Sequence, residues 1–185
     1  MSKEVRFIQK YVKDKTVLHI GGHKGQEGEM YKRVAKSFTF VEPHPHFVKV
    51  LRNKGYKVLP FAITNKEGLV DFFVTNNSQK SSLKEPTLVD SEHKETIKVR
   101  CVPLKDIQRG FDVLVIDAQG ETFEVLNSGD LVFDIILCEA STNPRYKGEK
   151  NREDIHKLLV SSNYKLINEL QHKSKDIYDL VYIKC

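Results

Sequence analysis

Five runs rich in Val, Ile, Leu and Phe recur along the chain, and segments with helical spacing separate several of them. The runs are TVLHI (16–20), SFTFVE (37–42), YKVLPFAI (56–63), FDVLVID (111–117) and FDIILCE (133–139). Each run is almost continuously apolar, whereas a strand with one face in water alternates apolar and polar residues. Strands of this kind are buried on both faces, as in a parallel sheet covered by helices. The sequence therefore predicts a three-layer α/β sandwich.

Helical spacing is clearest in three segments. Phe47 and Leu51 share one face of PHFVKVLRNKG, and Phe123 and Leu126 share one face of GETFEVLNSGD. The segment NREDIHKLLVSSN begins with Asn151, a favourable N-cap residue, and carries acidic residues in its first turn. We therefore expect a helix in each of the three segments.

Four further strands are expected outside this alternation: GLVDFFVTNN (68–77), ETIKVRCVPL (95–104), YKLINELQ (164–171) and DIYDLVYIK (176–184). The first two enclose the polar stretch 78–94, which we interpret as a loop or lid. The last two are joined by the polar residues HKSK, which favours a hairpin with an antiparallel terminal strand.

Composition limits the class of protein. The chain has 185 residues, of which 39% are hydrophobic and 30% charged, so we expect one folded domain and no membrane span. The first fifteen residues lack the apolar core of a signal peptide, which favours a cytoplasmic location. Cys101, Cys138 and Cys185 are far apart and form no CxxC pair, so reduced thiols are expected. Acidic residues interleave with the basic excess of +5, which makes nucleic acid possible as a partner but not favoured.

The stretch VLHIGGHKGQEGEM joins an apolar run to a helix-competent segment through a turn with three glycines in five positions. Glycines let the backbone approach a ligand closely, and the N-terminus of a helix offers free N–H groups. Strand, glycine turn and helix are therefore typical of nucleotide binding, and the alternative is a tight turn without a ligand. Two motifs are excluded. A dinucleotide fingerprint would need glycine in place of His23 and Gln26, and Lys24-Gly25 lacks the flanking residues of a Walker A loop.

The second apolar run ends in FVEP, which places Glu42 about twenty residues after the glycine turn. A carboxylate at this position can accept the hydroxyl protons of a ribose. The alternative is a solvated side chain at a strand end. Because Glu42 follows a glycine turn at the interval expected for a nucleoside site, we predict that it is a ribose ligand.

These residues resemble the FkbM-type S-adenosylmethionine-dependent methyltransferases, which have the class I methyltransferase fold. The resemblance runs from Val17 to about Ile183, and the segments that carry it are LHIGGHKGQE, FVEPHPHFVKVLRNK, LPFAITNKEGLVDFFV, NSQKSSL, VPLKDI, FDVLVIDAQGETFEVL and IILCEAS. It implies one class I methyltransferase-like domain over residues 1–185. The implied sheet is Rossmann-like, seven-stranded and mostly parallel, with an antiparallel terminal strand and an extra β-hairpin region.

The resemblance implies methyl transfer from the cofactor S-adenosylmethionine, with O-methylation of a sugar or small hydroxylated metabolite as the expected reaction. The acceptor would then be a small molecule or a glycan. The residues expected to bind the cofactor are His19, Gly21, Gly22, His23, Gly25, Glu42, Pro43, Ala62 and Asp117. Three alternatives stay open: a non-catalytic cofactor-binding or interaction module, an RNA methyltransferase, and an amino-group methyltransferase. The last rests on STNPRY (141–146), which is weakly similar to an Asn-Pro-Pro-Tyr motif.

Two positions depart from the family pattern. His19 stands where an acidic residue usually lies two positions before the first glycine, and Gln119 stands where a Glu often follows strand four. A carboxylate lost at position 19 removes one acceptor near the amino group of the cofactor's methionine. The two departures are the reason why a non-catalytic module stays among the alternatives.

Asp117 and Glu139 end two apolar runs that the resemblance makes neighbouring strands. A carboxylate there can serve as the general base for a hydroxyl acceptor, so we expect both residues to be catalytic. The alternative role for Asp117 is the N-cap of the following helix. Histidines at positions 19, 23, 44 and 46 gather near the first two strand ends and raise a metal site as a further alternative, but we predict no metal.

Overall fold

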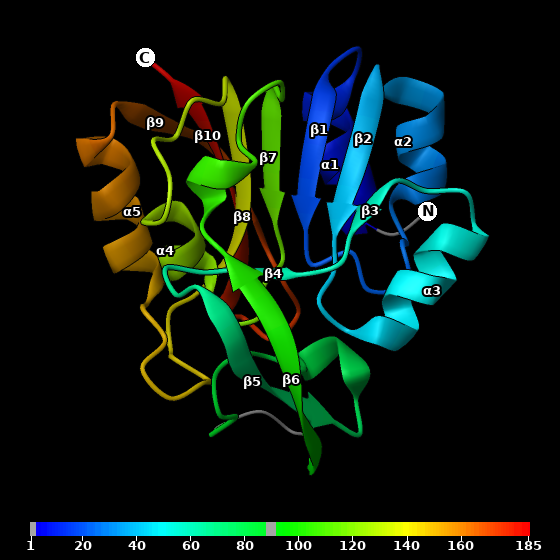
Figure 1. The fold of residues 1–185 in the computed structure, drawn as a ribbon. Helices are drawn as coiled ribbons and strands as arrows, with labels where there is room; N and C mark the ends of the chain where they lie inside the picture. The colour runs from blue at the N-terminus through cyan, green and yellow to red at the C-terminus, as the bar shows by residue number, and fades with distance from the viewer. Residues whose placement is uncertain (1–2, 88–91) are drawn as a thin grey trace.

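A computed structural model describes residues 3–87 and 92–185 and contains a large, twisted central sheet (Figure 1). The order of its seven strands is β3–β2–β1–β7–β8–β10–β9. Their bounds are β1 Thr16–Ile20, β2 Ser37–Val41, β3 Val58–Leu59, β7 Val113–Ile116, β8 Ile135–Ser141, β9 Tyr164–Gln171 and β10 Ile177–Lys184. β10 is antiparallel to both of its neighbours, whereas β3, β2, β1, β7 and β8 pair in parallel. The predicted seven-stranded, mostly parallel sheet is confirmed.

Five α-helices cover the two faces of this sheet within the described residues: α1 Lys3–Val12, α2 Gly28–Val34, α3 Pro45–Asn53, α4 Thr122–Leu126 and α5 Arg152–Ser161. Successive strand residues point to opposite faces, so Val17 packs with α1, α2 and α3 while Leu18 packs with α4 and α5. Two buried clusters therefore lie on either side of the sheet. This is the three-layer arrangement that continuous apolar strands predict.

A second, three-stranded sheet has the order β4–β6–β5, with bounds Ala62–Ile63, His93–Val102 and Gly68–Thr75 in that order. β5 and β6 form the predicted antiparallel pair. Figure 1 shows this sheet beyond the carboxyl ends of β1, β2 and β7. Two 3-10 helices complete the described elements, η1 Ser78–Lys80 and η2 Leu104–Asp106.

The expectation of one strand over residues 56–63 is wrong. Residues 56–63 instead contain β3 and β4, two residues each, in different sheets. Pro60 lies between them, and it lacks the N–H group that a sheet ladder requires. The N–H of Phe61 donates to the carbonyl oxygen of Leu59, which reverses the chain and directs it into the second sheet.

The helices follow the predictions with two differences. Asn151 caps α5 as expected, since its side chain accepts from the N–H groups of Glu153 and Asp154. The helix expected within GETFEVLNSGD forms but is only five residues long. The sequence argument does not predict α1, although Val5, Phe7 and Val12 bury one side of it.

The expected loop 78–94 is only partly described, because residues 88–91 lie outside the described part of the chain. Its first part forms η1 and then pairs with β5 through Phe73 and Ser82. The three cysteines are free thiols, with Cys101 and Cys138 buried and Cys185 exposed. None of the described helices has the length and apolar character needed to cross a bilayer.

Candidate functional site

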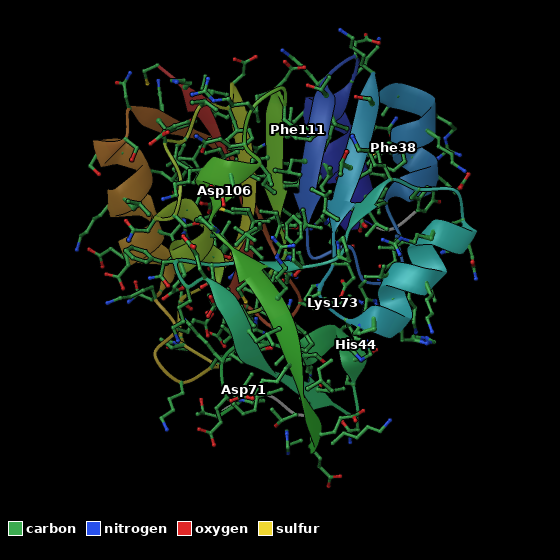
Figure 2. The ribbon with its side chains drawn as sticks, viewed as in Figure 1. Phe38, His44, Asp71, Asp106, Phe111 and Lys173 are labelled. Atoms are coloured by element: carbon green, nitrogen blue, oxygen red, sulfur yellow. The ribbon has the colours of Figure 1, made fainter. Side chains whose placement is uncertain are left out.

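A cavity of about 350 Å³ lies where the carboxyl ends of the parallel strands face the small sheet. This volume is in the range of small-molecule sites. Its walls come from the glycine turn, the end of β2, residues 61–63, residues 77–83 and residues 117–119. His44, labelled in Figure 2, is the N-cap of α3 and lies on the side of the small sheet, with its ring 6.3 Å from that of Phe72.

The glycine turn packs directly against the end of β7. Gly21 has a φ of +92°, and a Cβ atom there would lie 1.9 Å from the backbone oxygen of Asp117. Only glycine fits such a position, because both the conformation and the close approach exclude a side chain. Gly25 supports the turn from behind, where a Cβ atom would lie 2.7 Å from Leu51. Glycine is therefore required at both positions by the close packing of the turn, while His23 of the same turn lines the cavity.

Glu42 lies at the end of β2 with both carboxylate oxygens fixed by backbone groups. Oε2 accepts from the N–H of His23 at 2.7 Å, and Oε1 accepts from the N–H of His44 at 2.8 Å. The side chain is only 5% exposed yet lines the cavity. Burial raises the pKa of Glu42 to about 7, although the two N–H groups act in the opposite direction. The remaining lone pairs can accept hydrogen bonds from a ligand with two adjacent hydroxyl groups.

At the other side of the cavity, Gln119 connects the two predicted catalytic carboxylates. Its Nε2 donates to Asp117 Oδ1 at 2.6 Å and lies 3.3 Å from Glu139 Oε1. Nη2 of Arg145 donates to the same oxygen of Glu139 at 3.1 Å. A glutamate at position 119 would place a third carboxylate here, whereas the amide supplies donors to both. The departure from the family pattern at position 119 therefore has a structural role.

The electrostatics of this side favour protonated carboxyl groups. Burial, and then the neighbouring Asp117, raise the pKa of Glu139 to about 8, while Arg145 acts in the opposite direction. Removal from bulk water inside the cavity also raises the pKa of Asp117, and the hydrogen bond from Gln119 acts in the opposite direction. Nε2 of His172 lies 3.0 Å from Asp179 Oδ2, and this contact raises the pKa of His172.

Residues 77–83 line the cavity, and we call this segment the roof. It is held by contacts with His23, Gln119 and Tyr146. The Tyr146 hydroxyl lies 3.1 Å from both the carbonyl oxygen of Lys80 and Gln119 Oε1, so the two acceptors share its proton. Ser82 donates to the carbonyl oxygen of Gln119 at 2.6 Å. Nε2 of His23 lies 2.9 Å from the hydroxyl oxygen of Ser78. The roof thus contacts the glycine turn and the residues that follow β7.

Beyond the roof, residues 84–87 and 145–148 pair with each other. The N–H of Thr87 donates to the carbonyl oxygen of Arg145 at 3.0 Å, and that of Lys147 donates to Glu85 at 2.9 Å. A β-bridge joins Pro86 and Tyr146. Tyr146 is buried against Gly120, where a Cβ atom would lie 2.7 Å from its ring.

The cavity brings most of the sequence-predicted residues together. The predicted residues that line it are Gly21, His23, Glu42, Pro43, Ala62, Asp117 and Glu139. His19, Gly22 and Gly25 do not line it, so the structure does not bring these three of the predicted cofactor residues to the cavity. His19 points to the other face of β1, where its Nδ1 lies 2.8 Å from the Tyr31 hydroxyl. Burial there lowers its pKa to about 4, so the ring is neutral.

Two alternatives from the sequence receive no support. Asp117 is not a helix cap, because α4 begins at Thr122 and the cap position belongs to Glu121. The four histidines do not converge on one point. Within residues 3–87 and 92–185, the group of three potential metal ligands that comes together is Glu139, His172 and Asp179.

Sequence reasoning missed several residues of the cavity: Gln26, Glu27, Phe47, Phe61, Phe72, Arg145 and His172. Glu27 belongs to the glycine motif, so its neighbours could have drawn attention to it. His172 lies in the turn between β9 and β10, and its sequence context is only polar. It reaches the cavity because β10 pairs with β8, a contact that the local sequence does not indicate.

The stability of the ligand-free protein is expected to fall as the pH rises from about 6.5 to about 8.5. The folded pKa values of Glu42 and Glu139, about 7 and about 8, exceed their ordinary value of 4.5, so the folded state binds more protons in this range. His23, with its pKa lowered to about 4, acts in the opposite sense only below about pH 6.5. Melting curves should show the fall, and Glu139→Gln should reduce it by about 2 kcal/mol. An unchanged pH dependence in Glu139→Gln would contradict the assignment.

The fold and the glycine-turn cavity define a class: an α/β protein with the Rossmann-like methyltransferase architecture. Three solved structures share it. Magnesium protoporphyrin IX methyltransferase from Synechocystis, with bound S-adenosylmethionine, is 8% identical with a TM-score of 0.57, covering 99% of this chain and 79% of that one. Ribosomal protein L11 methylase from Lactobacillus delbrueckii is 12% identical with a TM-score of 0.57, covering 98% and 78%. Precorrin-6y C5,15-methyltransferase from Geobacter metallireducens is 11% identical with a TM-score of 0.56, covering 100% and 89%.

The family is shown by the sequence itself. The family model described as the methyltransferase FkbM domain matches residues 19–166, so the chain belongs to the FkbM methyltransferase family. S-adenosylmethionine is the cofactor expected for this family. A search of curated proteins by sequence finds no match.

The residues in the cavity fit this cofactor. The backbone at Gly21 leaves room for a close approach, and Glu42 offers acceptors for adjacent ribose hydroxyls. Burial disfavours the charged forms of the acidic groups at the other side of the cavity, and a cationic ligand would favour them; a sulfonium and an ammonium group are both cations. The acceptor is a separate question, because the three structural relatives are named for methyl transfer to a porphyrin, a ribosomal protein and a precorrin.

Proposed function

We propose that this chain transfers a methyl group from S-adenosylmethionine to a hydroxyl group of a small acceptor, such as a sugar. The observation that supports this most is that Glu42 and Asp117 line one cavity at the carboxyl ends of β2 and β7, the two strands that flank β1. The cofactor supplies a methyl group that its sulfonium already activates. The protein then has to align the acceptor and take up its proton.

Asp117 is the proposed base. Asp117 is exposed to the cavity, whereas Glu139 is 15% exposed and paired with Arg145, so Asp117 is the more accessible proton acceptor. Gln119 orients Asp117 through the hydrogen bond of 2.6 Å. Glu139, held by Arg145, would then position the acceptor. The mixed polar and aromatic lining near the small sheet, including Phe72 and Ser81, suits a hydroxylated molecule with apolar faces.

The amino-group alternative has less support. Asn143, the residue that would contact an amino group, donates from Nδ2 to Asp176 Oδ1 at 3.0 Å and does not line the cavity. An RNA acceptor and a module without turnover are outcomes of the test below. The cytoplasmic location and the single domain stay predictions from the sequence.

Glu42→Ala is expected to weaken binding of S-adenosylhomocysteine by about 2 to 3 kcal/mol, because charge-assisted bonds to the ribose hydroxyls are lost. Isothermal titration calorimetry measures this directly. Glu67→Ala is the control, since Glu67 is exposed and lies outside the cavity lining. Absence of any binding heat in the parent protein would reject the cofactor and the proposed function with it.

The acceptor requires a methyl-transfer screen with isotopically labelled cofactor across glycans, small hydroxylated metabolites and RNA. Transfer to a glycan or small alcohol would support the proposal. Transfer to RNA alone would replace it with the RNA alternative. Cofactor binding without transfer to any of the three would favour the binding module.

A further inference from the structure

Glu27 is a carboxylate of the cavity that accepts no hydrogen bond from a side chain of residues 3–87 or 92–185. It precedes α2 and occupies the N-cap position, but its side chain makes no capping hydrogen bond. Within the described residues, the hydrogen bond that its carboxylate accepts comes from its own backbone N–H. The residue is half-buried and lines the cavity. A half-buried carboxylate in a binding site, with no cation beside it, needs a partner that the protein does not supply.

The acidic groups around Glu27 strengthen the argument that it needs a cationic partner. Asp179 raises the pKa of Glu27 in addition to the effect of burial, and Glu27 in turn raises the pKa of Asp117. The cations nearby are already engaged, His172 with Asp179 and Arg145 with Glu139. Acidic groups therefore outnumber cations at the side where Glu27 lies, and burial disfavours their charged forms in the ligand-free protein. A cationic ligand group would favour those charged forms.

The position of Glu27 along the cavity follows from the strand order. β2, which carries Glu42 after its end, lies on one side of β1, whereas β10, which carries Asp179, lies beyond β7 and β8 on the other. Asp179 acts electrostatically on Glu27, and both act on Asp117, so Glu27 is near the acidic side of the cavity. A ligand whose ribose contacts Glu42 would extend its other end towards Glu27.

β1 carries His19 in place of an acidic residue, but Glu27, at the start of α2, supplies a carboxylate to the cavity. His19 is buried on the other face of β1, bonded to Tyr31, and cannot serve a ligand in the cavity. Glu27 lies one helical turn before Tyr31 on the same element, and its own side chain faces the cavity. An acidic residue has therefore not been lost from this site; one is present at a different position of the glycine motif.

We propose that Glu27 binds the ammonium group of the methionine part of the cofactor. This inference rests on the proposed function, because it assumes that S-adenosylmethionine occupies the cavity. The contact is a charge-assisted N–H···O hydrogen bond between an alkylammonium and a carboxylate, which is stronger than a bond between neutral groups. It would make Glu27 a binding residue and would leave Asp117 free for the acceptor.

The test compares two ligands that differ at the group in question. S-adenosylhomocysteine carries the ammonium, whereas 5′-methylthioadenosine has the same adenosine and thioether but no amino-acid part. Titration calorimetry of Glu27→Gln should show about tenfold or greater loss of affinity for S-adenosylhomocysteine and no change for 5′-methylthioadenosine. Glu29→Gln is the matched control, because Glu29 lies on the same helix but outside the cavity lining.

Unchanged affinity of Glu27→Gln for S-adenosylhomocysteine would overturn the inference, and so would an equal loss for both ligands. Glu27→Asp is a second variant, which keeps the carboxylate but shortens the side chain by one methylene group. An intermediate loss for S-adenosylhomocysteine alone would support the contact, and melting curves would show that both variants fold. Failure of the parent to bind either ligand is a different result, since it would reject the proposed function as well.

Discussion

Replacing Gly21 with alanine is expected to abolish measurable binding of S-adenosylhomocysteine and to lower the free energy of unfolding by about 3 kcal/mol or more. The new Cβ atom would lie 1.9 Å from the backbone oxygen of Asp117, so one of the two segments has to move. Neither moves easily, because β1 and β7 pair in parallel up to Ile20 and Ile116. Urea denaturation and calorimetry measure the two effects.

Gly68 provides the control for this prediction. Its φ of +93° is almost the same as that of Gly21, but no atom lies within 4 Å of the position of a Cβ. Gly68→Ala should therefore cost only the backbone strain, about 1 kcal/mol, and leave binding intact. The difference between the two variants isolates the close approach of the glycine turn to β7. Equal losses of stability in Gly21→Ala and Gly68→Ala would show that the close approach of Gly21 to β7 does not affect the free energy of unfolding.

Asp117→Asn is expected to lower turnover by about 10²-fold or more once an acceptor is identified, because the amide cannot take up a proton. Binding of S-adenosylhomocysteine should change little, since the variant keeps the size of the side chain. The asparagine can still interact with Gln119 through its own amide oxygen. Radiometric assays under saturating cofactor, with calorimetry beside them, separate the two quantities.

Glu139→Gln serves as the companion variant. If Glu139 positions the acceptor while protonated, its amide analogue should keep most of the turnover and raise the KM for the acceptor. Full turnover in Asp117→Asn, together with a large loss in Glu139→Gln, would transfer the role of base to Glu139. The result therefore assigns the base to one of two carboxylates that share a single amide donor.

The sequence predicted the parts of the fold that depend on local pattern. Val17 and Leu18 are both apolar because they face two different helical layers, and this produces a continuous run that is easy to recognise. The division of residues 56–63 into two strands at Pro60 was harder to predict, because the apolar run continues through the proline while the hydrogen-bonding pattern does not. Proline marked the break, but the run of apolar residues outweighed it in the prediction.

In the site, sequence spacing predicted residues that lie at strand ends. Glu42 and Asp117 follow β2 and β7, and parallel strands place such residues along one edge. The same reasoning placed His19 wrongly, because alternation along β1 turns its side chain to the opposite face from Ile20. Glu27 and His172 depend on how helices and turns fold back over the edge, and spacing within a strand carries no information on that.

The pairing of residues 84–87 with residues 145–148 has a consequence for protein engineering. These two segments are more than fifty residues apart in sequence, yet their hydrogen bonds and the bridge at Tyr146 join them into one unit. A loop graft that exchanges only one of them would lose its backbone partners and would withdraw Tyr146 from Lys80 and Gln119. Redesign of the acceptor range should therefore exchange both segments together, with Gly120 retained so that the tyrosine ring keeps its place.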